Sequence, residues 1–243
     1  MRFLLLILSS FVYADTYIHT SNYIDGISDN IKQDSTIIID DNGKIKSIEK
    51  GFISPGNNKF FDLTSYTVLP GLMDMHVHFG GEYQSKAERP VKVERETEAI
   101  LATVHAETTL NAGFTTVRQV GDSGFVSISL RDAINKGVVN GPRIFTSGKS
   151  IATTGGHADH TNGRAIDDYE YPVPEDGVIN GPYEAFTAVR QRYKDGANGI
   201  KLTVTGGVLS VAASGDNPQF TQTEVEAVVE AAKDYGFWVA VHA

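Results

Sequence analysis

Two histidines, His76 and His78, stand one residue apart near the end of the apolar run 71–79, which reads GLMDMHVHF. In an extended strand, residues i and i+2 point to the same face, so the two imidazoles are expected to lie side by side. Neutral imidazole is the commonest metal ligand, and the spacing therefore predicts a bound divalent metal ion. The alternative is a pair of solvated loop histidines, because short motifs of this kind also occur without a metal.

Two later apolar segments carry further side chains that could take part in binding or catalysis. Alternation in segment 200–205 places Lys201 on the face opposite to the apolar residues. Lysine is seldom buried without a partner, so Lys201 is expected to serve a site, to reach out to solvent, or to pair with a carboxylate such as Asp74. His242 ends the apolar segment 237–242 and by itself is also typical of an ordinary polar strand end.

These residues require a scaffold that brings strand ends together. Repeated β-then-α segments predict parallel strands with right-handed crossovers, in a doubly wound sheet or a (β/α)8 barrel. No GxGxxG follows a predicted strand, which disfavours a dinucleotide-binding sheet, and potential ligands at strand ends favour the barrel. The expected strands are 72–78, 115–120, 143–147, 200–205 and 237–242, and the expected helices are 94–111, 126–136, 183–194 and 222–235.

The N-terminal sequence has the layout of a secretory signal peptide. The positive residue Arg2 precedes the apolar run 3–12, and the compact residues Val12 and Ala14 occupy the −3 and −1 positions of a cleavage site. The run is roughly half of the ~20 residues that a bilayer span needs. We therefore expect residues 1–14 to be removed, no membrane anchor to remain, and the mature chain to be exported to the periplasm or secreted.

Composition narrows the classes of partner. The chain has 243 residues, of which 41% are hydrophobic, enough to build a substantial core. Its formal net charge of −9 disfavours nucleic acid, which selects for basic patches. The absence of cysteine removes disulfides and cysteine chemistry from consideration. A small-molecule partner remains, and the sequence leaves open whether the chain forms a homo-oligomer.

Residues 15–68 differ from the rest of the chain in their sequence pattern, which predicts strands without intervening helices. A β-branched run at 36–39 is followed by an Asn42-Gly43 turn signal and by Ile45 and Ile48 with lysines nearby, a pattern that predicts a β-hairpin. We interpret 15–68 as a small, sandwich-like β-domain that is incomplete by itself, and 69–243 as the strand–helix domain.

The order of these motifs resembles the amidohydrolase superfamily. The histidine pair on the first barrel strand, Lys201 on the fourth and His242 on the fifth match the positions of that superfamily's metal site. The resemblance also covers the N-terminal hairpin and the segments LPGLMD at 69–74, GFTTVR at 113–118 and GPRIF at 141–145, and therefore nearly the whole mature chain. The segments TGGHAD at 154–159 and TGGVLS at 205–210 are similar to the branch that contains imidazolonepropionase-related proteins and Xaa-Pro, Xaa-Arg and Xaa-Lys dipeptidases.

The resemblance implies a particular metal centre. Two divalent ions, usually zinc, would be held by His76, His78, Lys201 and His242, with Lys201 carboxylated by CO₂ so that it bridges the ions as an anion. Such ions lower the pKa of a bridging water, and the resulting hydroxide attacks an amide carbonyl. Asp74, which shares a face with His76, is either a hydrogen-bond acceptor that orients a ligand or a plain structural residue.

The long segment 148–182 follows the third strand, on the side where a barrel has its active site. Loops longer than about 15 residues are usually functional or disordered. We therefore predict that His157, in the TGGH sequence, lines the substrate pocket; the alternative is a solvated loop histidine.

The resemblance also implies how far the fold extends. The superfamily has a histidine on strand six and an aspartate on strand eight, the latter acting as general base and metal ligand. A (β/α)8 barrel needs about 250 residues, whereas residues 69–243 contain five expected strands. We expect a barrel truncated after its fifth strand, the N-terminal portion of a longer enzyme, with the general-base aspartate beyond Ala243 and no activity in this chain alone.

Three functions follow from the sequence. The first is an exported, zinc-dependent hydrolase of a C–N (amide or peptide) bond, with a dipeptide as the expected substrate. The second is a cyclic amidohydrolase or deaminase of the same superfamily. The third is a non-catalytic exported remnant or binding protein that keeps half a metal site. Zinc content and turnover separate the third function from the first two.

Overall fold

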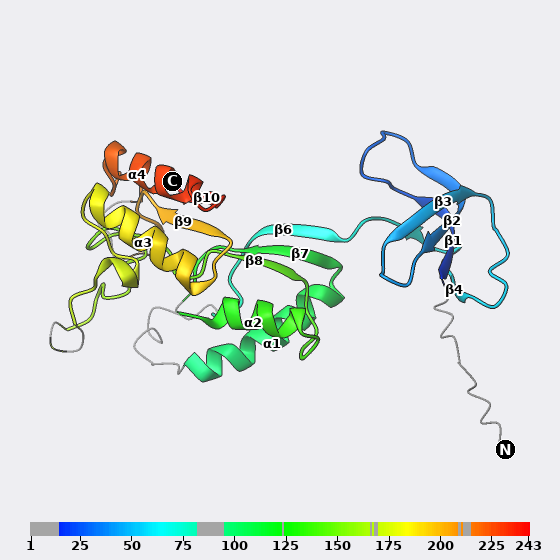
Figure 1. The fold of residues 1–243 in the computed structure, drawn as a ribbon, viewed down its shortest axis with the longest axis horizontal. Coiled ribbons are helices and arrows are strands. Elements are labelled where there is room, and N and C mark those ends of the chain that lie inside the picture. Colours follow the sequence, from blue (N-terminus) through cyan, green and yellow to red (C-terminus); the bar gives the residue numbers. More distant parts are fainter. Residues whose placement is uncertain are drawn as a thin grey trace, which may run out of the picture. The chain divides into compact units, whose positions relative to one another are not determined.

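A computed structural model of the chain describes residues 15–81, 95–122, 124–165, 167, 170–208, 210 and 215–243. The expected signal peptide, residues 1–14, lies outside these described residues. The chain divides into two compact units, Met1–Pro70 and Gly71–Ala243 (Figure 1). No helix in the described ranges is both long and apolar enough to cross a lipid bilayer.

The first unit is built on one β-sheet. Its strands run in the order β3-β2-β1-β4, and β5 also pairs with β1. The predicted hairpin is confirmed: β2 and β3 are antiparallel, and Gly43, at φ +75°, closes the turn by donating its N–H to Asp40 O. The sandwich-like arrangement stays a prediction. The strands are β1 (Thr16–Tyr23), β2 (Lys32–Ile39), β3 (Ile45–Lys50), β4 (Lys59–Asp62) and β5 (Thr67–Val68).

The second unit begins with three parallel strands in the order β6-β7-β8. Two helices pack against them, and the shared core contains Ala102 and Ala106 of α1 together with Val117 and Ile144 of the sheet, all of them buried. The small alanines let the helix approach the strands closely. The elements are β6 (Leu72–Val77), α1 (Arg95–Asn111), β7 (Phe114–Gln119), α2 (Val126–Asn135) and β8 (Arg143–Thr146).

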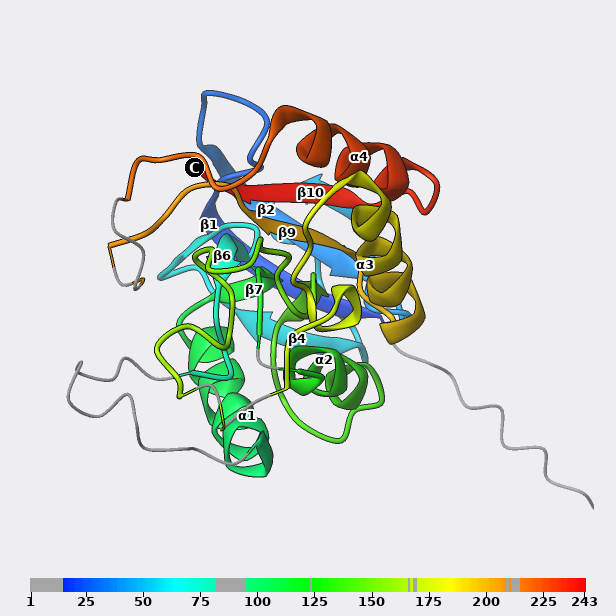
Figure 2. The ribbon, with the colours of Figure 1, turned by 90° about the vertical axis from the view of Figure 1, so that its left-hand side faces the viewer.

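The rest of the second unit repeats this construction around two parallel strands, β9 and β10. Helices α3 and α4 cover them, as both views show (Figures 1 and 2). Ile200 and Leu202 point into this core and are fully buried against Val189 and Val228 of the helices. The elements are η2 (Pro174–Asp176), α3 (Pro182–Asp195), β9 (Gly199–Thr203), α4 (Gln222–Lys233) and β10 (Trp238–His242).

Main-chain hydrogen bonds join the two sets of strands. Ile151 donates to Lys201 O at 2.7 Å and accepts from Thr203 N at 3.1 Å, so the chain after β8 continues beside β9 in parallel. Asn198 N donates to Thr146 O at 2.7 Å. The α/β class and the parallel strands in chain order are therefore confirmed. The described residues contain five such strands and no closed barrel, so the eight-stranded closure stays a prediction.

Helix α4 begins with a capping box. Thr221 Oγ1 accepts from Glu224 N, and Glu224 Oε2 accepts from Thr221 N at 2.8 Å. Because the cap satisfies N–H groups that the helix leaves unpaired, we expect Thr221→Ala to lower the free energy of unfolding by about 1 kcal/mol. Urea denaturation measures this loss. Gln222→Ala, in the same turn, is the control and should change stability by less than about 0.5 kcal/mol; equal effects would contradict the role of the cap.

Candidate metal centre

His76 and His78 lie at the C-terminal end of β6 and face each other. Their Nε2 atoms are 3.1 Å apart, which confirms the predicted side-by-side placement. The strand ends at Val77, one residue earlier than predicted, where the pairing with β7 shifts register after Asp74. His78 Nδ1 lies 3.1 Å from Gly121 O. A carbonyl only accepts, so Nδ1 carries the proton and Nε2 presents its lone pair.

Asp74 acts on the main chain of the histidine pair. Its Oδ1 accepts a hydrogen bond from His76 N at 2.9 Å. This contact fixes the backbone of His76, and the alternative ion pair between Asp74 and Lys201 does not occur in the structure. A link from Asp74 to a ligand ring, the other sequence interpretation, stays a prediction.

Lys201 is buried in the middle of β9. Its residue is 5% exposed, between the fully buried Ile200 and Leu202, so the predicted division of the strand into an apolar and a lysine-bearing face is confirmed. Its ammonium group makes no hydrogen bond or ion pair with any described residue. Burial lowers the pKa of Lys201, and the positive charge of Arg118 lowers the pKa further. An anion at this position would be favoured where an ammonium is not.

Two contacts fix the guanidinium of Arg118, whose positive charge acts on Lys201. Arg118, on β7, donates from Nε to Met75 O at 2.9 Å. Its guanidinium lies over the ring of Trp238, 5.2 Å from the centroid, in a cation–π contact. Arg118 thus ties β6, β7 and β10 together while keeping its positive charge close to Lys201.

His242 and His157 form a second pair of imidazoles. Their ring centroids are 4.4 Å apart and the planes are tilted by 30°. His242 Nε2 lies 2.8 Å from Gly206 O, so this nitrogen donates and Nδ1 is left with its lone pair. His157 Nδ1 is buried and has no hydrogen-bond partner among the described residues. A buried, unpaired ring nitrogen is costly unless a ligand or ion satisfies it.

The positive charge of Lys201 affects the pKa of one histidine in each imidazole pair. Burial is the largest cause that lowers the pKa of His76 and of His157, and the charge of Lys201 lowers both further. The lowered pKa values keep these imidazoles neutral, which is the form that binds metal. Among the described residues, no three His, Asp or Glu side chains come close enough together to hold a metal ion. Lys201 thus acts on one ring of each pair, His76 and His157, and the complete four-residue site stays a prediction.

The donor set fits the implied centre in its chemistry. The Nε2 atoms of His76 and His78 face each other, Nδ1 of His242 keeps its lone pair, and the nitrogen of Lys201 has no anionic partner among the described residues, so metal ions and a carboxylated lysine would find suitable donors here.

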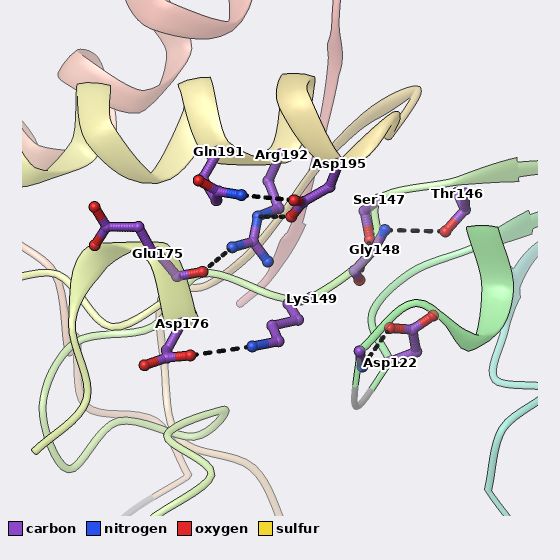
Figure 3. A network of polar contacts seen from close by, with 11 residues as sticks. Asp122, Thr146, Ser147, Gly148, Lys149, Glu175, Asp176, Gln191, Arg192 and Asp195 are labelled. Carbon is purple, nitrogen blue, oxygen red and sulfur yellow. Dashed lines mark hydrogen bonds and ion pairs between the residues drawn. The ribbon is translucent and has the colours of Figure 1, made fainter. Parts of the chain in front are cut away.

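An ionic network holds the segment after β8, which carries His157 (Figure 3). Arg192 of α3 is 1% exposed; it donates from Nη2 to Glu175 O, and its Nε lies 3.6 Å from Asp195 Oδ2. Lys149 Nζ lies 3.2 Å from Asp176 Oδ1. Helix α3, the short helix η2 and the start of the segment are therefore fixed to one another.

Main-chain hydrogen bonds connect this ionic network to the residues of the predicted site. Gly177 O accepts from Ala152 N at 2.8 Å, and the preceding residue, Ile151, bonds the carbonyl of Lys201 and the N–H of Thr203. Five residues after Ala152 the chain reaches His157. The anchoring of η2 thus bears on the placement of both Lys201 and His157.

Comparison with known proteins decides the family. The model of the amidohydrolase family matches residues 67–243. The chain belongs to the amidohydrolase family. The resemblance inferred from the histidine pair, Lys201 and His242 is therefore confirmed at the level of the family.

Several proteins of known structure or function are similar to this amidohydrolase chain. The crystal structure of a Xaa-Pro dipeptidase with methionine bound in its active site shares 69% sequence identity, with a TM-score of 0.91 over 94% of this chain and 56% of that one. A prolidase complexed with N-methylphosphonate-L-proline shares 29%, with a TM-score of 0.81 over 94% of this chain and 56% of that one. Ochratoxinase from Aspergillus niger is 31% identical over 192 residues, 72% of this chain and 38% of its own. The chain thus spans about half the length of the two solved structures.

Residues that hold His157 in this amidohydrolase chain were not found from the sequence. Gln219 Oε1 accepts from His157 N at 2.8 Å. The buried carboxylate of Asp159 accepts from Gly155 N at 2.8 Å and from the N–H and hydroxyl of Thr161. The Asp159 contacts are local, and an aspartate two residues before a threonine in a glycine-containing loop is the signal that predicts them.

The glycines after β9 come close to both rings of the second imidazole pair. A Cβ atom at Gly207 would lie 2.5 Å from Cε1 of His157, and Gly206 supplies the carbonyl that His242 contacts. The TGG sequence at 205–207 was identified as a family motif without a role. A side chain there would displace the His157 ring, which explains a glycine at this position.

His157 is expected to act on substrate and not on metal retention. In the full-length protein, His157→Ala should raise KM or lower kcat while the metal content stays unchanged. Steady-state kinetics with metal analysis of the same samples measures both. His160→Ala, an exposed histidine of the same loop, is the matched control and should behave as wild type. Wild-type kinetics of His157→Ala would remove this residue from the site.

Proposed function

We propose that this chain is the N-terminal part of a metal-dependent amidohydrolase that cleaves a C–N bond of a small substrate, most simply a dipeptide. The observation that carries the proposal is the buried Lys201, which lacks an anionic partner in the described structure and lies in the same compact unit as the facing histidines His76 and His78. The similarity to a Xaa-Pro dipeptidase at 69% identity supports the substrate class. Because that protein is matched over 56% of its length, the activity is assigned to the full-length protein.

In this proposal His76, His78, Lys201 and His242 hold two divalent ions, which we take to be zinc. When bound, the ions polarise the scissile carbonyl and lower the pKa of water. The chain's own residues prepare the site: Asp74 fixes the backbone of His76, and the proton on Nδ1 of His78 leaves Nε2 available.

Carboxylation of Lys201 requires its neutral amine. The nitrogen attacks the carbon of CO₂, an N–C bond forms, one C–O π pair moves to oxygen, and the nitrogen releases a proton. Burial and the charge of Arg118 both lower the pKa of Lys201, which increases the fraction of neutral amine. The product is an anion, which the surrounding positive charge favours.

The substrate is proposed from two relatives and from the chemistry of the site. One relative has methionine bound in its active site and another binds N-methylphosphonate-L-proline. We propose a dipeptide, with a cyclic amide or amidine as the second candidate. The sequence at residues 1–14 supports export to the periplasm or outside the cell as part of the proposal.

Metal removal tests the proposed activity. We expect the full-length protein to hydrolyse one or more of a panel of dipeptides that includes Xaa-Pro, Xaa-Arg and Xaa-Lys, to lose this activity after treatment with a chelator, and to regain it with zinc. Amino-acid release and metal analysis are the measurements, and a cyclic amide in the panel tests the second candidate. Metal binding without turnover of any substrate would favour a binding protein, and turnover that survives complete removal of metal would contradict the proposed mechanism.

A further inference from the structure

Gln119 is a fully buried amide at the last position of β7, 0% exposed. Its Oε1 accepts from Phe79 N at 2.9 Å, and its Nε2 donates to Gly121 O at 3.0 Å. An N–H only donates and a carbonyl only accepts, so the two partners determine which way the amide points. The side chain therefore bridges the residue after His78 and the turn after β7.

The carbonyl of Gly121 receives a second hydrogen bond at the same time. His78 Nδ1 lies 3.1 Å from this oxygen, which has a lone pair for each donor. Gly121 is at φ +107°, and a Cβ there would lie 2.3 Å from Ser150 Oγ, so this carbonyl belongs to a turn that requires glycine. One oxygen thus joins the buried amide of Gln119 to the imidazole of His78.

Gln119 acts on His78 from two directions. Its hydrogen bond with Phe79 N fixes the backbone directly after His78. Its hydrogen bond with Gly121 O fixes the carbonyl that accepts from His78 Nδ1. The second contact sets the tautomer, because a fixed acceptor at Nδ1 leaves the lone pair on Nε2. That nitrogen is the one that lies 3.1 Å from His76 Nε2.

We propose that Gln119 is a positioning residue for His78, which fixes the tautomer and orientation in which Nε2 is presented to a metal ion. The inference rests on the metal site of the proposed function. Apolar residues are the usual occupants of fully buried strand positions, and a buried amide is tolerated here because both its ends are hydrogen-bonded. Removing a contact that orients a ligand typically weakens metal binding by about 10–100-fold.

Gln119→Met tests the inference, because methionine has a similar length and neither hydrogen bond. The first unit offers a matched control in Thr36, which is also 0% exposed. Thr36 Oγ1 accepts from Ile53 N at 2.9 Å and donates to Gly51 O at 2.8 Å. Thr36→Val therefore removes the same kind of buried bridge between two backbone groups, at a place with no predicted ligand.

The measurement is the affinity of the metal-free, full-length protein for Co²⁺, followed by its visible absorption, together with the midpoint of urea unfolding. We expect Gln119→Met to bind Co²⁺ about 10–100-fold more weakly and with an altered spectrum. Thr36→Val should lower stability and leave the affinity within about two-fold of wild type, a factor well below the change that loss of a ligand-orienting contact causes. Gln119→Glu, which keeps the acceptor for Phe79 N and loses the donor to Gly121 O, should also weaken binding at least about ten-fold, and it serves as the test if the methionine variant does not fold.

Each other outcome overturns the inference. Wild-type affinity and spectrum in the foldable Gln119 variants would show that the amide does not position His78. Equal weakening in Thr36→Val would show that lost stability, and not lost positioning, controls the affinity. Absence of Co²⁺ binding by the wild-type protein would overturn the proposed metal site together with this inference, whereas unchanged binding in the variants overturns this inference alone.

Discussion

Replacement of Lys201 by methionine is expected to remove metal-dependent hydrolysis while leaving the metal-free protein at least as stable as the wild type. If Lys201 serves the metal site as proposed, loss of the anion that its carboxylated form would supply should cost roughly 4 kcal/mol of transition-state stabilisation, which corresponds to about 10³-fold in kcat/KM. The stability effect has the opposite sign because the buried ammonium has no partner among the described residues, so an apolar side chain removes an uncompensated charge.

The two effects of Lys201→Met are measured separately. Hydrolysis of the best substrate gives kcat/KM, and urea denaturation in the presence of a chelator gives the free energy of unfolding. Lys194→Met, at an exposed position of α3, controls for the loss of a positive charge and should change neither quantity. A variant that keeps its activity, or that is strongly destabilised without metal, would show that Lys201 is a structural cation.

Arg192→Met is expected to destabilise the protein strongly. It leaves the carboxylate of Asp195, whose side chain is 13% exposed, without its cation, and it removes the donor from Glu175 O. Breaking a buried pair by removal of one partner costs about 3–5 kcal/mol. Because Asp195 is the group left unpaired, the double variant Arg192→Met, Asp195→Asn should recover part of this loss.

A double-mutant cycle of urea denaturation curves measures the coupling between Arg192 and Asp195. The cycle consists of the wild type, Arg192→Met, Asp195→Asn and the double variant, all as full-length protein. Strictly additive changes would contradict the pairing, since they would mean that Arg192 contributes through its bulk alone.

The features of the site that the sequence predicts are those that depend on residues close together in the chain. The facing of His76 and His78 follows from their spacing in a strand, and the burial of Lys201 follows from alternation with Ile200 and Leu202. The bounds of the helices and strands agree to within two residues for the described positions, because caps, glycines and apolar periodicity are local signals.

The contacts around the predicted site residues depend on residues far apart in the sequence. Gln119 meets Phe79 across a separation of 40 residues, and His157 meets Gln219 across 62. Spacing carries no information about such pairs, since they form only after the sheet has brought its strand ends together. Arg192 shows both cases: Asp195 lies one helical turn away, whereas Glu175 belongs to the segment before the helix.

The arrangement of strands in chain order has a consequence for how the second unit folds. Strands β6, β7 and β8 share one buried core with α1 and α2, and β9 and β10 share another with α3 and α4. Each strand pairing therefore spans one β–α repeat, as between Thr116 and Arg143, so a strand can pair only after the helix that precedes it has been synthesised. A chain emerging from the ribosome can bury the first of these cores before residue 199 has been synthesised, and the later strands then add to a surface that is already ordered.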